Sequence, residues 1–174
     1  IVNAAVPGDF IALNALLFAE SDFEHLCKTP VSAFRIPPKA AREALRRAPA
    51  LANALFWANA HEESILAERI VSLGRRSARV RTAHVLCEFI ARLEIIRQIS
   101  FPEMAIPISQ EDFADILGIS VVHMNKVLRS LERDGVLAFR LGVLMVHDRG
   151  ELERLAGFES GYLHFTRRDD ATGA

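Results

Sequence analysis

The chain has 174 residues, of which 51% are hydrophobic and 25% are charged, and its formal net charge at pH 7 is -1. This length suits one domain of moderate size or two small ones, because domains usually run to about 100–200 residues. The balance between acidic and basic residues excludes a protein that coats nucleic acid by charge alone. Any contact with nucleic acid must therefore be local.

The cysteines and the apolar runs limit the cellular setting. Cys27 and Cys87 lie far apart and form no CxxC pair, so neither a zinc site nor a disulfide framework is predicted. No apolar run approaches the roughly 20 residues of a membrane helix, and no signal-peptide pattern follows Ile1. We therefore expect a cytoplasmic protein without membrane contact. The abrupt start at Ile1, without a methionine, indicates a fragment.

Residues 1–48 look like the remainder of a β-rich unit. The segment 7–9 (PGD) is a turn signal, and the segment 31–36 (VSAFRI) is a β-prone run that two prolines end. Pro38 can begin a helix that reaches Ala48, because proline is tolerated at the first helical position.

Residues 49–74 are predicted to form one long helix, because apolar residues recur at three- and four-residue steps. The apolar stripe spans about six turns of 3.6 residues, which favours a partner helix from a two-fold-related copy. Packing of the stripe on the chain's own domain is an open alternative. A hinge is placed at Gly74. The expected dimer interface is Leu51, Leu55, Ala58, Glu62, Ile65 and Arg69.

The segment after Gly74 begins a second core. Residues 75–96 predict an amphipathic helix with arginines on its outer face. The segment 100–109 (SFPEMAIPIS) carries two prolines, which suits a loop followed by a short edge strand near Ile106 and Ile108.

Residues 109–147 contain two helix signals and a hairpin signal. Ser109 with Asp112 resembles a capping box, and Gly118 supplies the left-handed residue that ends the first helix. Ser120 is a natural N-cap for a second helix. A β-hairpin is predicted around Leu141, so the pattern is that of a helix-turn-helix with a wing. The expected inward face of the second helix is Met124, Val127, Leu128 and Leu131.

From Gly8 to about Phe158 the chain resembles the Crp/Fnr superfamily of bacterial transcription regulators. The most specific part is 108–157 (ISQEDFADILGISVVHMNK to ELERLAG), and the segments 72–89 (SLGRRSARVRTAHVLCEF) and 7–10 (PGDF) also match. The resemblance implies a mainly α protein with small β elements, an α+β fold. Residues 1–48 would be the end of a cyclic-nucleotide-binding-like β-roll sensor, 49–74 a dimerisation helix, and 75–174 a winged helix-turn-helix domain.

The same resemblance implies a function and partners. It implies a cytoplasmic homodimer that binds pseudo-palindromic double-stranded DNA through a recognition helix at 120–133 in the major groove, with RNA polymerase as a further partner. The superfamily's cyclic-nucleotide binders hold ribose and phosphate with signatures that 10–28 lacks, and their adenine-binding Thr-Ser pair falls on Leu66 and Ala67. Cyclic AMP is therefore not expected, because its phosphate would lack an arginine partner. Cys27 alone gives no support to an iron-sulfur cluster, and the effector and cofactor stay unknown.

The recognition helix departs from the superfamily's usual pattern. Val121, Val122 and Lys126 match base-reading Arg, Glu and Arg, although SVVHMNK is similar to a recurring SVVHxNR variant. Asn125 can bind adenine, Lys126 can donate to guanine, and valine methyls can pack on thymine. The other expected DNA contacts are the polar His123, Ser109, Gln110 and Ser120 at helix N-termini, where capping is the alternative role, and Arg129 and Arg140 beside phosphates.

The motifs of common enzymes and metal sites do not occur in the sequence. There is no nucleophile elbow, phosphate-binding glycine loop or HExxH motif, and the histidines lack metal-site spacing, so we expect neither catalysis nor a metal. Two hypotheses remain. The chain is a dimeric, sequence-specific transcription regulator, or it is an interaction or scaffold protein of the same fold that has lost specific DNA reading, as the two valines could indicate.

Overall fold

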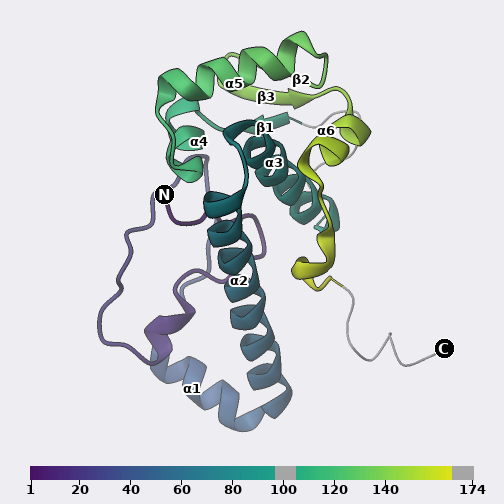
Figure 1. Ribbon diagram of the computed structural model, residues 1–174. Coiled ribbons are helices and arrows are strands. Elements are labelled where there is room, and N and C mark those ends of the chain that lie inside the picture. The colour runs from purple at the N-terminus through teal and green to yellow at the C-terminus, as the bar shows by residue number, and fades with distance from the viewer. Residues whose placement is uncertain (97–104, 166–174) are drawn as a thin grey trace, which may run out of the picture.

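The computed structural model describes residues 1–96 and 105–165. Figure 1 shows one long helix, α2, with α1 at one end and the helices and sheet of the C-terminal part at the other. The mainly α class with a small antiparallel sheet is confirmed. The elements are η1 (Leu13–Leu16), α1 (Pro38–Arg47), α2 (Pro49–Arg75), α3 (Ala78–Ile95), β1 (Ala105–Pro107), α4 (Gln110–Leu117), α5 (Val121–Arg133), β2 (Leu137–Arg140), β3 (Val143–Val146), α6 (Arg149–Ala156) and η2 (Ser160–Leu163).

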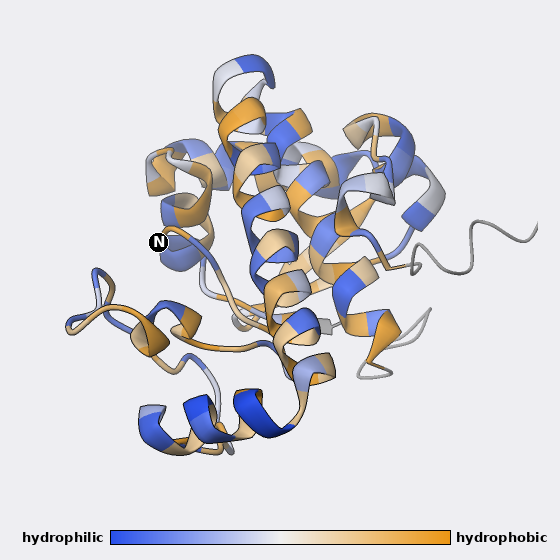
Figure 2. Cartoon of the chain, turned by 90° about the horizontal axis from the view of Figure 1, so that it is seen from below, coloured by the Kyte–Doolittle hydropathy of each residue, from blue (hydrophilic) through white to orange (hydrophobic). Residues whose placement is uncertain are grey.

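Residues 1–48, all of which are described, form no strand. The predicted turn is present, with the Asp9 N–H donating to Val6 O at 3.1 Å. The β-prone run 31–36 is not a strand, because a strand needs a hydrogen-bonded neighbour and the described part of the chain places none beside it. Many apolar residues of this segment are exposed, such as Phe18 and Phe34. Figure 2 shows such hydrophobic residues on the outer loops as well as on the helices.

The long helix α2 is confirmed, but the hinge is misplaced. Gly74 lies inside α2, and Arg76 still donates its N–H to Ser72 O at 3.1 Å. The break falls at Arg76 and Ser77, where Ser77 takes an extended conformation and caps α3 by accepting from the Val80 N–H. A glycine inside a helix costs only about 1 kcal/mol, so Gly74 alone does not end α2. The helix ends at the next residues, where the Ser77 side chain caps the start of α3.

The α2 stripe expected at a dimer interface is covered by the chain's own residues only at its C-terminal end. Ile65 is 0% exposed and Arg69 is 7% exposed within a single chain, so these two offer little surface to a partner. Leu51 is exposed and Leu55, Ala58 and Glu62 are half-buried, and their place at an interface stays a prediction. Arg69 donates to Glu88 of α3 at 2.8 Å, and Glu62 accepts a hydrogen bond from Asn3. The C-terminal end of the stripe therefore packs on its own chain. The opposite side of α2 exposes Phe56, Ile70 and Val71 instead.

A buried charge network joins α2, α3, the N-terminal turn and η2. Glu88 is 1% exposed and accepts from both Arg69, at 2.8 Å, and Arg92, at 3.3 Å. Arg92 also donates to Asp9 at 2.6 Å, and the Tyr162 hydroxyl donates to Glu88 at 3.2 Å. Burial raises the pKa of Tyr162, which therefore stays a hydrogen-bond donor. The turn at 7–9 is in this way tied to the core of the C-terminal part.

Next to this network, a histidine is buried in its neutral form. His84 of α3 is 2% exposed, and burial lowers the pKa of its imidazole. Its contact with Glu68 at 3.3 Å is therefore not a salt bridge at neutral pH. Its ring stacks on Tyr162, with ring centroids 5.8 Å apart, and meets Phe158 edge-on at 5.3 Å. The histidine thus serves the packing of α3 against the C-terminal segment.

The sheet is antiparallel with the strand order β1-β3-β2. The predicted edge strand is confirmed as β1, in which Ile106 pairs with Leu144 of β3. The predicted hairpin is β2 and β3, with Leu137 opposite Val146. The expected loop at 100–104 lies outside the described residues. Inward residues of the sheet and of α3, α4, α5 and α6 form one core, which includes Leu86, Ile90, Phe113, Leu117, Met124, Leu131, Leu144 and Leu152.

Candidate nucleic-acid interface

The turn between α4 and α5 has the geometry that the glycine predicted. Gly118 lies in the left-handed region at φ 61° and ends α4, and the Ile119 N–H donates to Ala114 O at 3.0 Å. Ser120 then caps α5, its hydroxyl accepting from the His123 N–H at 3.2 Å. Both bonds satisfy helix-end groups that would otherwise lack partners. The two helices are therefore held at a sharp, defined turn.

Helix α5 has two sharply different faces. Its expected inward residues are confirmed as buried, with exposed fractions of 0% for Met124, 6% for Val127, 2% for Leu128 and 0% for Leu131. The other face lies at the edge of the molecule farthest from α1 (Figure 1). Val122, at 68% exposed, is prominent on it. The remaining predicted contacts of α5 are also exposed or half-buried: Val121, His123, Asn125, Lys126 and Arg129.

The N-terminus of α4 differs from what a phosphate contact requires. The Ser109 hydroxyl accepts from the Asp112 N–H at 3.0 Å and lies 2.7 Å from the Asp112 carboxylate, to which it donates. Lys28 also pairs with Asp112, at 2.6 Å, and its hydrogen bond holds the pKa of this carboxyl below its ordinary value. The structure thus shows Ser109 as a cap, the alternative role. Its contact with phosphate, and that of half-buried Gln110, stay predictions.

The wing is fastened to the end of α5 through one carboxylate. Glu132 accepts from the Phe139 N–H at 2.8 Å and from the Arg140 guanidinium at 2.6 Å, and these bonds, the backbone one first, lower its pKa. Leu141 and Gly142 both have positive φ, of 52° and 76°, as a tight hairpin turn requires. The predicted phosphate neighbour Arg140 is therefore exposed beside α5 but already paired.

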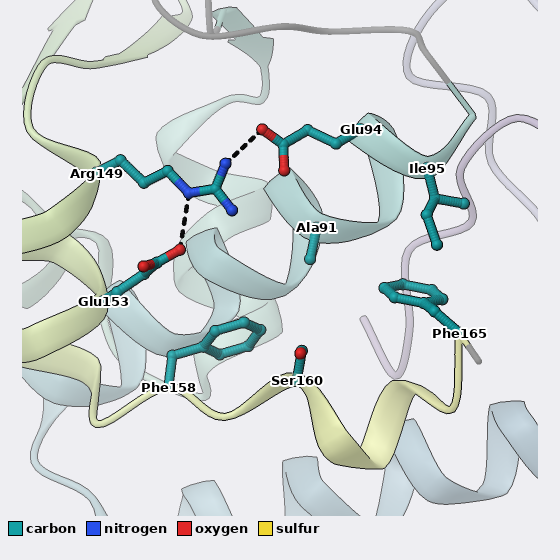
Figure 3. Close-up of a pocket in the computed structure, with 8 residues that line it drawn as sticks. All are labelled: Ala91, Glu94, Ile95, Arg149, Glu153, Phe158, Ser160 and Phe165. Carbon is teal, nitrogen blue, oxygen red and sulfur yellow. Dashed lines mark hydrogen bonds and ion pairs between the residues drawn. The ribbon is translucent and has the colours of Figure 1, made fainter. Parts of the chain in front are cut away.

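A hollow with a volume of about 430 Å³ lies between α3 and α6 (Figure 3). Arg149 stands at its edge between Glu94, at 2.5 Å, and Glu153, at 2.7 Å, while Phe158 and Phe165 face it from the C-terminal segment. One guanidinium is thus shared by two carboxylates, and Ser160 adds a hydroxyl to the lining. The arginine among these lining residues is already paired, so it is not free to orient an anionic ligand.

The described residues were also compared with what a reactive cysteine, a metal site or a membrane helix requires. Burial raises the pKa of the Cys87 thiol to about 12, so this cysteine stays protonated and is a poor nucleophile. Among the described residues, no three His, Cys, Asp or Glu side chains gather as a metal site would require. Within the same residues, every helix falls short of the length and apolarity needed to cross a membrane.

Comparison with known proteins agrees with this geometry. The profile of the Crp-like helix-turn-helix domain matches residues 80–155. The nitrogen fixation regulation protein FixK of Bradyrhizobium diazoefficiens is 28% identical over 156 residues, which are 90% of this chain and 65% of FixK. The solved structure of FixK2 from Bradyrhizobium japonicum has a TM-score of 0.62 and 25% identity, covering 71% of this chain and 61% of FixK2. These matches support membership of the chain in the Crp/Fnr superfamily.

The Crp/Fnr match extends from α3 to α6 and thus includes both helices of the turn and the wing. The transcriptional activator protein FnrL of Cereibacter sphaeroides is a further relative, 26% identical over 141 residues, which are 79% of this chain and 56% of FnrL. The chain therefore spans 65% of the length of FixK and 56% of that of FnrL.

Two features of the structure were missed from the sequence. The exposed side of α2 was overlooked because its apolar residues are interrupted by Asn59 and Glu63, although Phe56 and Ile70 share a helical face. The pairing of Arg69 and Arg92 with Glu88 carried no local signal beyond the four-residue spacing of Glu88 and Arg92.

Proposed function

We propose that this chain regulates transcription by binding double-stranded DNA in a sequence-specific manner through α5. The observation that carries the proposal is the division of α5 into a fully packed face and an exposed face at the margin of a Crp/Fnr helix-turn-helix. Its relatives FixK and FnrL are named as a nitrogen fixation regulation protein and a transcriptional activator, which supports a regulatory role.

On DNA, the exposed face of α5 would lie in the major groove. The amide of Asn125 can pair with adenine, and Lys126 can donate to guanine O6 and N7. Arg129 lies one turn beyond Asn125 and would contact phosphate, which positions the helix without reading sequence. The buried face only holds α5 in place. Arg140 in the wing would contact phosphate if its guanidinium exchanges the Glu132 carboxylate for a phosphate of the DNA backbone.

The working form would be a cytoplasmic homodimer on a pseudo-palindromic site, with RNA polymerase as a further partner. The dimer contact belongs to the exposed side of α2, where Phe56 is 78% and Ile70 is 71% exposed. An exposed apolar stripe on a long helix is typical of an interaction surface. Half-buried Leu66 and exposed Ala67 cannot hydrogen-bond an adenine, so the effector would differ from cyclic AMP.

A binding assay with matched variants tests the proposal. A site selected from random DNA should bind more tightly than random sequence, with an affinity that falls steeply as salt rises. Asn125→Ala should cost about 1–3 kcal/mol on that site and relax preference at one base pair. Arg129→Ala should instead weaken all sequences alike and flatten the salt slope, because a phosphate contact carries no sequence information.

The control is Arg46→Ala, which removes an exposed arginine of α1, at the far end of the molecule from α5 (Figure 1). It should leave both affinity and salt slope unchanged. If the selected site binds no more tightly than random DNA, the chain is a scaffold protein of this fold and the proposal is wrong.

A further inference from the structure

We propose that the first turn of α5 reads the C5-methyl group of thymine, through Val122 with Val121 beside it. This inference rests on the proposed DNA binding and names the chemistry that the helix recognises. It makes Val122 a specificity-determining residue, although a valine has no hydrogen bond to offer a base.

The first observation is where the valines lie relative to the core. The other four large apolar residues of α5 are between 0% and 6% exposed, whereas Val122 is 68% exposed and Val121 is 37% exposed. The helix begins at Val121, directly after the N-cap Ser120, so the phase of the helix directs these two side chains away from the core. Most of the surface of Val122 therefore lies outside the packing of the single chain, and Val121 is partly open beside it.

The second observation is what shares the face with them. Asn125 and Arg129 follow Val122 at three and seven residues, and Lys126 follows it at four, so all lie on one side of the helix. The valines thus sit among the groups best placed to meet DNA. Valine is rigid at χ1, so its two methyl groups form a firm surface with little entropy left to lose on binding.

The third observation is what this face lacks. Glu132 is the single carboxylate within α5, and the Phe139 N–H and Arg140 hold it at the wing. The Ser120 hydroxyl is engaged in capping His123. No carboxylate of α5 is therefore free to accept from a cytosine amino group. The thymine methyl is the apolar group of the major groove, and it fits a surface of valine methyls.

Deoxyuridine tests this directly, because it lacks the methyl of thymidine and keeps the same hydrogen-bonding edge. Each dT of a selected half-site is replaced in turn by dU, and binding is measured for the wild type and for Val122→Ala. For the wild type, one position should weaken binding about fourfold, the worth of one buried carbon group at 0.8 kcal/mol. For Val122→Ala, the same replacement should have little effect, because the methyl has lost its partner.

Two controls sharpen the reading. Placing 5-methyl-dC opposite dG at that position should bind more tightly than unmodified dC by a similar factor, since it restores the methyl alone. Leu141→Ala removes an exposed apolar side chain at the tip of the wing and should keep the full sensitivity to dU. Thermal unfolding should show that Val122→Ala is folded, as expected for a surface position.

The outcomes separate this inference from the proposed function. If the wild type binds its site specifically and no dU position matters, or if Val122→Ala is as sensitive to dU as the wild type, methyl reading is overturned while DNA binding stands. If the wild type shows no preference for any unmodified site, the proposed function fails and this inference fails with it.

Discussion

At the scale of single residues, Glu88 is a buried carboxylate that accepts hydrogen bonds from two buried arginines. These arginines, Arg69 and Arg92, both direct a guanidinium at its Oε1 atom. Arg69 makes this bond through Nη2, and its Nε and Nη1 have no hydrogen-bond partner among the described residues. A buried charge is costly unless it is paired, and Arg92 also pairs with Asp9, so it is Arg69 that depends on the Glu88 carboxylate. The aromatic face of Phe89, 5.8 Å from the Arg69 guanidinium, adds a weaker attraction.

We predict that Glu88→Gln lowers the free energy of unfolding by about 3–5 kcal/mol, because it keeps the shape but leaves the buried Arg69 without a counter-charge, while Arg92 keeps its ion pair with Asp9. Urea unfolding measures the change. The control is Glu94→Gln on the same helix, whose carboxylate pairs with Arg149 at 2.5 Å in a partly exposed setting. An ion pair open to water contributes less than about 1 kcal/mol. Equal losses of unfolding free energy in the two variants would show that burial does not determine how much these ion pairs contribute to stability.

At the scale of elements, the ends of the helices decide how the C-terminal part folds. Ser77, Ser109, Ser120 and Asp148 each cap a helix through a side-chain oxygen, and Gly118 and Gly157 end α4 and α6 in the left-handed conformation. These groups satisfy the free N–H and C=O groups of short helices, which gain little from length. The helix-turn-helix is therefore defined by its termini.

Alanine substitutions at two glycines test this view, because the free energy of unfolding should fall at one position and rise at the other. Gly118→Ala should lower the free energy of unfolding by about 1–2 kcal/mol, since a left-handed φ of 61° strains any residue with a Cβ. The new Cβ would lie 3.4 Å from Leu73 Cδ2, an ordinary contact, so the cost is in the backbone. Gly74→Ala, inside α2 with nothing within 4 Å, should raise it by about 0.5–1 kcal/mol. Thermal unfolding should therefore move the two midpoints apart, and a shift in the same direction would contradict the assignment.

At the scale of the whole molecule, α2 presents two apolar sides and the single chain covers one of them. The covered side meets α3 and η2, and the open side carries Phe56, Ile70 and Val71. A helix of 27 residues is about 40 Å long, enough to pair with a second helix over its whole length. This open side is the one on which the proposed dimer would form.

We predict that Phe56→Glu combined with Ile70→Glu yields monomers, because like charges would be buried close to their symmetry mates. Sedimentation equilibrium measures the mass. Val122→Glu is the matched control, since it adds a glutamate at an equally exposed apolar position on α5 and should leave the dimer intact. A double variant that remains a dimer would place the contact elsewhere in the chain.

The sequence by itself determined helices α1 to α5 and the three strands in their order, whereas η1, α6 and η2 were not predicted. The limits of α1, the turn at Gly118, the inward face of α5 and the hairpin all followed from caps, glycines and periodicity, because these signals act between residues a few positions apart. The run 31–36 failed for the complementary reason. Its residues favour a strand, but a strand exists only when another strand lies beside it, and local preference does not supply one.

Only the tertiary structure decided which side of α2 is covered and which charged groups pair. The stripe at Ile65 and Arg69 and the stripe at Phe56 and Ile70 are both compatible with a helix that packs on something, and periodicity does not say on what. The partner of Arg69 is 19 residues away and that of Arg92, Asp9, is 83 residues away, so no local pattern could pair them. Burial and ion pairing depend on the neighbours in space, and those neighbours are known only when the whole chain has folded.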